Sequence, residues 1–500
     1  MASNGDEREE DVKMEECKET AVYMWGYLPG VSPEKSPIFS PVQVPFPASS
    51  IHGGDSWKDV CGGGCGFAMA ISVAYVLENV ELGSGKLITW GSTEDEGQSY
   101  TTSGKHGEIP EPFPLPHEAS VVKVAAGWAH CVSVTVTGEV YTWGWKECVP
   151  SVKSIRESAA AGSFQKDNNG KQSALPTEQA SPRSQGSSSN GGAVSQSDKK
   201  AGEEVNKKRK VSAVKEEFEN LSSGDDFFTV SPSLVTLGPG VRITNVAAGG
   251  RHTLALSVSD MGQVWGWGYG GEGQLGLGSR IKMVSSPHLI PCFDTSTAGK
   301  DWSLIVPQGS LNSSAQASKF PGSYVKEIAC GGRHSAVVTD AGALFTFGWG
   351  LYGQCGQGST NDQLRPTCIP TLSSIQVESV AAGLWHTVCI TANRRVYAFG
   401  GNQFGQLGNG ADQDETRPTL LDAPSLESKR AKMVSCGARH SAILTEDGQV
   451  YSWGWNKYGQ LGLGDSIDRN IPSRVPIEGC QPKNVECGWW HTLLLAETTV

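Results

Sequence analysis

The segment GARHSAILTEDGQVYSWG, from Gly437 to Gly454, determines the fold. After His440 comes a short run of alternating apolar and small residues, then the turn Glu-Asp-Gly, and then the aromatic run Val-Tyr-Ser-Trp-Gly. The Asp-Gly step supplies the positive φ that a tight hairpin needs. Because the alternation has a period of two, the segment predicts two paired strands and not a helix.

This hairpin recurs along the chain. Six copies begin with a glycine, two residues and a histidine, and their histidines are His130, His252, His334, His386, His440 and His491. A degenerate seventh copy, VCGGGCGFAMAIS from Val60, places Gly66 at the histidine position. Seven aromatic strands ending in glycine begin at Val22, Leu87, Val140, Val264, Leu344, Val396 and Val450. The last four histidines are 52, 54 and 51 residues apart, a period typical of one four-stranded propeller blade.

The order of the two patterns predicts how the ring closes. The chain begins with an unpaired aromatic strand, which contains Tyr23 and Trp25, and ends with an unpaired histidine strand from His491. Pairing these strands completes the seventh blade and leaves no open sheet edge at the seam. The sequence therefore predicts an all-β, single seven-bladed β-propeller over residues 21–500, closed by its N- and C-terminal strands.

Three polar segments lie outside this pattern. Residues 1–20 read as an acidic, disordered tail, and residues 296–322 as a second polar insertion without an assigned role. Residues 151–231 form a low-complexity insertion, which has too few apolar residues to order itself. Within it, Lys207, Lys208, Arg209 and Lys210 fit the acidic grooves of a nuclear import receptor and predict a nuclear protein; a solvated charge run and weak phosphate contact are the alternatives.

Composition and charge exclude several classes of protein. The formal net charge is −11, so sequence-specific DNA binding is not expected, whereas basic partners such as histones would be attracted. No run of 18 apolar residues predicts a membrane span, and the polar N-terminus does not resemble a secretory signal. Of the 13 cysteines, only Cys61 and Cys65 are close in sequence, and no second pair completes a zinc site. We expect buried thiols in a reducing compartment.

The repeated residues do not predict an active site. Each histidine holds the same place in its blade, so the histidines are spread around the ring, and we expect each to bond a neighbouring backbone group. Arg251, Arg333 and Arg439 precede three of them and either contact a partner on one face of the ring or form salt bridges between blades. Neither G-x-S-x-G nor H-E-x-x-H is present. The sequence predicts no catalytic residue, no cofactor and no metal.

One motif imitates a nucleotide site. Gly268, Gly270 and Gly273 fit the dinucleotide fingerprint G-x-G-x-x-G. However, no helix pattern follows, and related segments recur from Gly350, Gly401 and Asn456 as a loop of the repeat. We therefore interpret the glycines as part of a repeated loop.

Taken together, the G-x-x-H strands, the aromatic-glycine strands and the GQLG loops resemble the regulator of chromosome condensation family, and the acidic lead and interrupted blade are similar to its plant members. The resemblance implies a seven-bladed propeller. It also implies a non-catalytic nuclear protein that binds chromatin proteins as a monomer and regulates gene expression, including in the response to stress such as cold. The family also contains an exchange factor for the small GTPase Ran and an ultraviolet-B photoreceptor, and both activities are alternatives.

The sequence departs from both alternatives. The exchange factor has a basic N-terminal tail and an inserted wedge, whereas this tail is acidic and no wedge is found. The photoreceptor carries tryptophan in successive G-W-R-H-T units. Here only Trp128 and Trp489 hold that position, in blades far apart in sequence, while Trp385 and Trp490 stand one place later.

Overall fold

The structure is a computed structural model that describes ten stretches of the chain. They are residues 19–27, 37–47, 55–64, 67–74, 85–91, 109–128, 130–150, 228–258, 262–291 and 324–498. The basic cluster Lys207–Lys210, the predicted insertion at 296–322, most of the insertion at 151–231 and the tail before residue 19 lie outside these stretches, as do Cys65 and Gly66.

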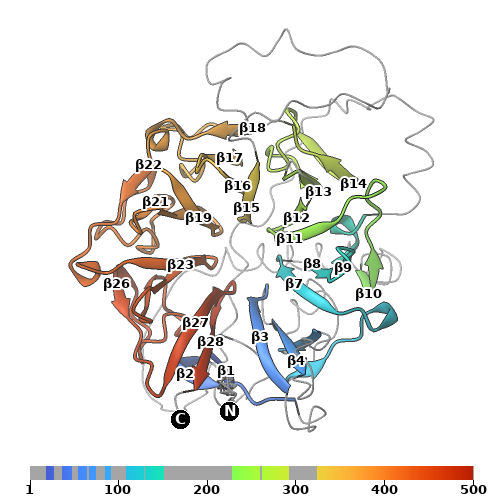
Figure 1. The fold of residues 1–500 in the computed structure, drawn as a ribbon. Coiled ribbons are helices and arrows are strands. Elements are labelled where there is room, and N and C mark those ends of the chain that lie inside the picture. The colour runs from blue at the N-terminus through green and yellow to red at the C-terminus, as the bar shows by residue number, and fades with distance from the viewer. Residues whose placement is uncertain are drawn as a thin grey trace, which may run out of the picture.

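Seven four-stranded antiparallel sheets stand in a ring, as predicted (Figure 1). Blade 1 contains β3 (Asp55–Gly62), β4 (Ala68–Ala74), β5 (Lys86–Trp90) and β6 (Glu111–Pro112). Blade 2 contains β7 (Val121–Ala126), β8 (His130–Thr135), β9 (Val140–Trp145) and β10 (Phe228–Leu234). Blade 3 contains β11 (Ile243–Ala248), β12 (His252–Ser257), β13 (Val264–Gly270) and β14 (Ile281–Leu289).

The next three blades repeat this order from the innermost to the outermost strand. Blade 4 contains β15 (Val325–Cys330), β16 (His334–Thr339), β17 (Leu344–Gly348) and β18 (Gln363–Cys368). Blade 5 contains β19 (Val377–Ala382), β20 (His386–Thr391), β21 (Val396–Gly400) and β22 (Glu415–Leu420). Blade 6 contains β23 (Ala431–Cys436), β24 (His440–Thr445), β25 (Val450–Gly454) and β26 (Arg469–Arg474).

Blade 7 is built from both ends of the propeller, which confirms the predicted closure. Its order is β27 (Cys480–Cys487), β28 (His491–Thr498), β1 (Thr20–Gly26) and β2 (Ile38–Gln43). β1 pairs with β28 over its whole length, from Thr20 opposite Glu497 to Gly26 opposite His491, and the two strands lie side by side in Figure 1. Two boundaries differ slightly from those expected, because β1 already begins at Thr20 and β10 at Phe228.

The aromatic strands supply the core between blades. One ring per blade is fully buried next to the strand's last glycine: Trp25, Trp90, Trp143, Trp267, Phe347, Phe399 and Trp453. The glycine is required at this point, because Gly454 has φ 103° and a Cβ there would lie 2.5 Å from the carbonyl oxygen of Arg439. The four repeated glycine-rich loops continue into turns and an outer strand, and no helix follows Gly273 before β14.

Proline marks the outer edge of every blade. The outermost strands contain Pro41, Pro232, Pro287, Pro366, Pro418 and Pro472, and Pro110 directly precedes the short β6. Proline has no N–H to offer and is tolerated on edge strands, where it prevents another strand from pairing. These prolines recur at one register position, a sequence signal that the repeat analysis missed.

Blade 1 corrects one prediction from the sequence. Ala68 faces Trp90 across the hairpin as Cys131 faces Trp143, so Phe67 and not Gly66 holds the histidine position. The loop that precedes Phe67 is one residue longer than in the other blades, which shifted the alignment. Phe67 is fully buried, so an apolar ring replaces the imidazole in this blade.

Helical structure in the described residues comprises four 3₁₀ turns, η2 (Pro116–Glu118), η3 (Lys146–Cys148), η7 (Pro370–Leu372) and η8 (Pro424–Leu426). In this part of the chain, no helix has the length and apolar character needed to cross a membrane.

Candidate functional site

The repeated histidines connect neighbouring blades. Each of five histidines places Nε2 2.7–3.0 Å from a hydroxyl of the next blade, where we had expected a backbone group. The pairs are His130–Thr253, His252–Ser335, His334–Thr387, His386–Ser441 and His440–Thr492. The sequence signal was the Ser or Thr that directly follows a histidine. In the next blade, the residue at this position faces the imidazole of the blade before it.

The hydroxyls fix the form of the imidazoles. Thr387 Oγ1 donates to the carbonyl of Gln354 at 2.9 Å, so it must accept its other bond from the Nε2–H of His334. Burial lowers the pKa of His130 to about 4 and of His252, His334, His386, His440 and His491 to about 3. The five bonded imidazoles are neutral and fully buried, so they serve as hydrogen-bond donors between blades, and they are spread around the ring instead of being gathered as metal ligands or bases.

This series of histidine–hydroxyl bonds between blades, here called the relay, is interrupted on both sides of blade 1. The residue that would bond His491 is Ala68, and within the described stretches neither ring nitrogen of this fully buried histidine has a hydrogen-bond partner. At the next junction, Phe67 replaces the donor and Cys131 stands at the hydroxyl position. Blade 1 therefore lacks the histidine bonds that connect the other blades.

One end of the propeller forms an aromatic–arginine face. The G-x-x-H loops and the ends of the aromatic strands meet at this end of every hairpin, because the strands are antiparallel. The face consists of Tyr27, Trp128, Trp145, Arg251, Tyr269, Arg333, Trp349, Tyr352, Trp385, Phe404, Arg439, Trp455, Tyr458, Trp489 and Trp490. Most of these rings are half-buried, and the neighbouring Leu351 is 52% exposed.

Two of the predicted arginines combine ring contacts with salt bridges between blades. Arg251 lies 4.0 Å from the ring centre of Trp145 and pairs with Glu147 of the preceding blade. Arg333 lies 5.1 Å from the Trp349 ring and 3.4 Å from a carboxylate oxygen of Glu272. Both guanidinium groups thus have a carboxylate within the chain.

Arg439 differs from the other two. Its guanidinium carbon lies 4.8–5.8 Å from four ring centres, those of Trp385, Phe404, Trp455 and Trp490. Phe404 stands at the loop position that Glu272 holds in blade 3, so a ring replaces the carboxylate. Burial lowers the pKa of Arg439, and its buried Nε has no hydrogen-bond partner among the described residues. This cation has aromatic neighbours but no ion pair in the described part of the chain.

Two tryptophans that are distant in sequence meet on this face. Trp128 of blade 2 and Trp489 of blade 7 stack with ring centres 6.0 Å apart and planes at 27°. Ring closure leaves only blade 1 between them, and its Gly64 has no side chain to separate the rings. Their backbone N–H groups donate to Gly249 and Gly63 of neighbouring blades, each at 3.2 Å.

The sequence analysis missed most of the aromatic residues of this face. Trp145, Tyr269, Trp349, Trp455 and Tyr27 directly follow the last glycine of an aromatic strand. Tyr352, Phe404 and Tyr458 occupy the position two residues before the loop glutamine. Both positions recur and could have been found from the repeat, but only the folded ring shows that they form one surface. Among the described residues, no group of three or more His, Cys, Asp or Glu side chains is placed to hold a metal ion.

Comparison with known proteins agrees with this architecture. Residues 220–498 match the RCC1-like domain, and residues 121–148 match the regulator of chromosome condensation (RCC1) repeat. The ultraviolet-B receptor UVR8 of Arabidopsis thaliana is 32% identical over 420 residues, which is 82% of each chain. Human WBSCR16 has a similar fold, with a TM-score of 0.61, 21% identity and coverage of 96% of this chain and 100% of that one.

A second solved structure gives the same result for the fold. Prp20p from Saccharomyces cerevisiae aligns with a TM-score of 0.61 at 17% identity, over 97% of this chain and 93% of its own. At this identity the likeness concerns the fold alone. The domain match and the long alignment with the plant receptor carry the assignment, and the chain belongs to the regulator of chromosome condensation family.

Proposed function

We propose that this chain is a non-catalytic nuclear propeller that binds chromatin proteins, histones among them, and regulates gene expression. The observation that carries the proposal is the aromatic–arginine face. Half-buried aromatic rings and arginine are enriched in the energetically important centres of protein interfaces. The net charge of −11 favours a basic partner. The structure of Prp20p is described together with its binding to Gsp1p and histones, and yeast RCC1 (Prp20) is known in complex with Kap60.

Arg439 is the residue of this face on which we expect binding to depend most. Its guanidinium lies among four rings and has no carboxylate partner in the described chain, so its N–H groups can donate to carbonyl or carboxylate oxygens of a docked protein. The rings of Trp455 and Trp385 would then cover the contact and exclude water. Truncating such a central residue typically costs about 2 kcal/mol or more of binding free energy.

The experiment is a pull-down of nuclease-treated core histones on the purified full-length protein. Arg439→Gln should weaken capture at least about tenfold, in line with the loss of one interface hot spot. The matched control is Arg430→Gln, an exposed arginine that pairs with Glu446 in the hairpin turn at the opposite end of blade 6. Failure of wild-type protein to retain histones rejects the proposal. Recovery of a small GTPase that added nucleotide releases would support the exchange-factor alternative instead.

A second candidate is ultraviolet-B perception, because tryptophans gather around Arg439. Trp455 and Trp490 have ring centres 5.0 Å apart, and the 32% identity to the receptor extends over 82% of the chain. Against this candidate, the G-W-R-H-T position is Gly250, Gly332, Leu384 and Ala438 in blades 3 to 6. Illumination with ultraviolet-B followed by size-exclusion chromatography tests it, and an unchanged elution volume excludes it.

A further inference from the structure

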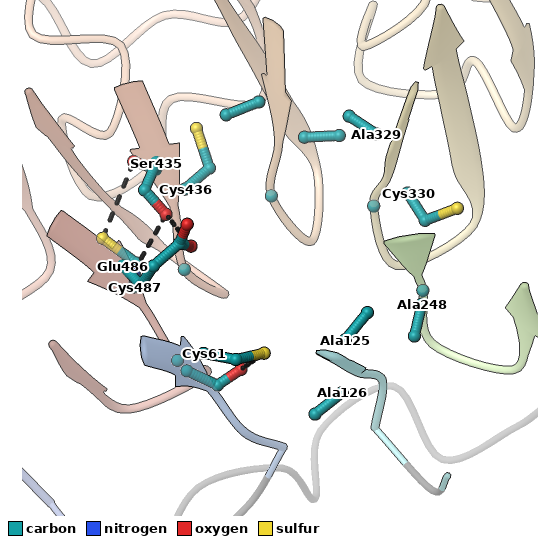
Figure 2. Close-up of a pocket in the computed structure, with 18 of the residues that line it drawn as sticks. Cys61, Ala125, Ala126, Ala248, Ala329, Cys330, Ser435, Cys436, Glu486 and Cys487 are labelled. Carbon is teal, nitrogen blue, oxygen red and sulfur yellow. Dashed lines mark hydrogen bonds between the residues drawn. The ribbon is translucent and has the colours of Figure 1, made fainter. Parts of the chain in front are cut away.

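The central channel of the propeller contains carboxyl groups that the proposed function does not use. The seven innermost strands surround an open channel with a cavity of about 260 Å³, and Figure 2 shows Glu486 and Ser435 on one side of it and Cys61 on a neighbouring strand. Most lining side chains are small, such as Ala125, Ala329 and Ala381. The charged side chains among the described residues of the lining are Lys123, Glu327 and Glu486.

The lysine of the described lining, Lys123, already forms an ion pair with Asp59. Lys123 Nζ lies 2.9 Å from Asp59 Oδ2, and the amide of Asn484 donates to the other oxygen of Asp59 at 2.8 Å. Burial disfavours the charged lysine, but Asp59 and Glu486 outweigh burial and raise the pKa of Lys123 above its ordinary value. Lys123 and Asp59 therefore form a neutral pair, which leaves Glu327 and Glu486 without an ion pair among the described residues.

Each remaining carboxyl connects two blades through a hydroxyl. Glu327 of β15 accepts from Ser379 Oγ of β19 at 2.9 Å, and Glu486 of β27 accepts from Ser435 Oγ of β23 at 3.2 Å. Ser435 Oγ also accepts the backbone N–H of Cys487 at 2.9 Å, so this contact lies at the junction of blades 6 and 7. A change of charge on either acid acts directly on a contact between blades.

The surroundings favour the protonated form of both acids. Burial is the main cause that raises the pKa of Glu327 and of Glu486 to about 7 each. The hydroxyls of Ser379 and Ser435 and the charges of Lys326 and Lys123 oppose this effect, whereas Glu378 and Asp59 add to it. The other polar groups of the lining are Asn245 of β11, Ser435 of β23 and four thiols, those of Cys61, Cys330, Cys436 and Cys487. Burial raises the pKa of all four thiols, so they stay neutral.

We propose that the channel is a proton-responsive device, in which Glu327 and Glu486 are neutral in mildly acidic solution and ionise together as the pH rises through neutrality. Two carboxylates that have no ion pair among the described residues and are packed in the narrow channel repel each other and lose part of the water that an exposed carboxylate keeps. Each ionised carboxylate accepts a stronger hydrogen bond from its serine, but the lost hydration and the mutual repulsion outweigh this gain, so ionisation lowers the stability of the folded ring. This inference is independent of the proposed function.

The test compares the unfolding of wild-type protein with that of Glu327→Gln, Glu486→Gln and the double variant between pH 4.5 and 8.5. Glutamine keeps the size and the acceptor oxygen but cannot ionise. Guanidinium unfolding followed by tryptophan fluorescence gives an unfolding constant at each pH. Glu427→Gln, at an exposed position in the connection between β22 and β23, is the matched control.

The sign follows from the raised pKa. An acid that titrates at about 7 in the folded protein and near 4.5 when unfolded stabilises the fold below pH 4.5, and this stabilisation is lost as the pH rises to 7. The ratio of the wild-type to the variant unfolding constant should rise with pH, by at most about tenfold per pH unit for each acid. The ratio should level off above pH 7 and stay constant for the Glu427 control. A ratio for the double variant that does not change with pH overturns the proposal.

A direct readout covers the case in which the double variant does not fold. The carboxyl carbons of ¹³C-glutamate-labelled wild-type protein should include two signals that titrate near neutral pH, and each single variant should lose one of them. If every glutamate signal in the folded wild-type protein titrates in the ordinary range of exposed carboxyls, the proposal is wrong.

Discussion

Replacing Ala68 with serine should strengthen the junction between blade 7 and blade 1. His491 is fully buried, and neither of its ring nitrogens has a hydrogen-bond partner in the part of the chain that the structure describes. At the equivalent position of other blades, Ser335 and Ser441 place a hydroxyl 2.9 Å from Nε2 of the histidine in the preceding blade, and both serines are buried like Ala68. Serine at position 68 supplies the missing acceptor in a geometry that the fold already uses.

The size of the effect follows from the hydrogen bond gained. A buried donor left without a partner costs about 1–3 kcal/mol, and a typical hydrogen bond contributes about 0.5–1.5 kcal/mol net. Part of the gain is offset because the serine hydroxyl must itself be buried. We expect Ala68→Ser to stabilise this junction by about 1 kcal/mol, a factor of about five in the equilibrium of local opening.

Hydrogen–deuterium exchange measures this opening where it occurs. Peptides that cover β4 and β28 should exchange about five times more slowly in Ala68→Ser, at the factor expected for 1 kcal/mol. Ala70→Ser is the matched control, because Ala70 is equally buried in the same strand but does not stand at the position that would bond His491. The control should exchange faster than wild type.

The reasoning is refuted if Ala68→Ser accelerates exchange in these peptides as much as Ala70→Ser does. That result would mean that the hydroxyl cannot reach His491, and that the interruption of the relay at blade 1 is not a deficit of hydrogen bonding.

Further predictions concern pH, closure, targeting and one strained turn. The six histidines have folded pKa values of about 3 to 4 and ordinary values of 6.5 when unfolded, so the stability they provide is present above pH 6.5 and lost as the pH falls. Each histidine contributes a slope of about 1.4 kcal/mol per pH unit to the free energy of unfolding, and the six together outweigh the opposite effect of Glu327 and Glu486. An equal free energy of unfolding at pH 5 and pH 7, measured with denaturant, would contradict this assignment. Deleting Thr20–Gly26 removes the strand that closes blade 7 and should lower the melting temperature of the whole propeller, which calorimetry would show; an unchanged temperature argues against closure. Alanine at Lys207–Lys210 should move a fluorescent fusion into the cytoplasm, and unchanged nuclear signal removes the targeting prediction. Arg394 has φ 66° at a turn position where other blades have glycine. Arg394→Gly should therefore relieve about 1–2 kcal/mol of backbone strain and lose about 0.2–1 kcal/mol for each of the two ion pairs of Arg394. A change of more than about 2 kcal/mol in the measured free energy of unfolding would contradict this balance.

The sequence by itself determined the number of blades and the way the ring closes. Both follow from local chemistry, since a hairpin needs alternating residues, a turn glycine and a glycine after each buried ring, and these recur at a period of one blade. The unpaired strands around Trp25 and His491 then specified the closure. One assignment was wrong: Gly66 was placed at the histidine position that Phe67 holds. The reason is that a single inserted residue in a degenerate loop cannot be located without the partner strand.

Contacts between blades were decided only by the tertiary structure. The histidines bond hydroxyls one blade away, at separations of 52 to 123 residues, and a repeat pattern does not give the rotation that brings these positions together. Trp128 and Trp489 meet because closure of the ring brings the ends of the chain together and Gly64 leaves room for both rings. The acids of the channel illustrate the same limit. Glu327 stands four residues before a repeat glycine, as Lys123 and Asp59 do. Only the closed ring shows that the lysine neutralises Asp59, so that Glu327 and Glu486 have no ion pair in the described stretches. Charge balance in a channel depends on every strand that faces it, and this is why the fold could be predicted from one repeat whereas the chemistry of the channel could not.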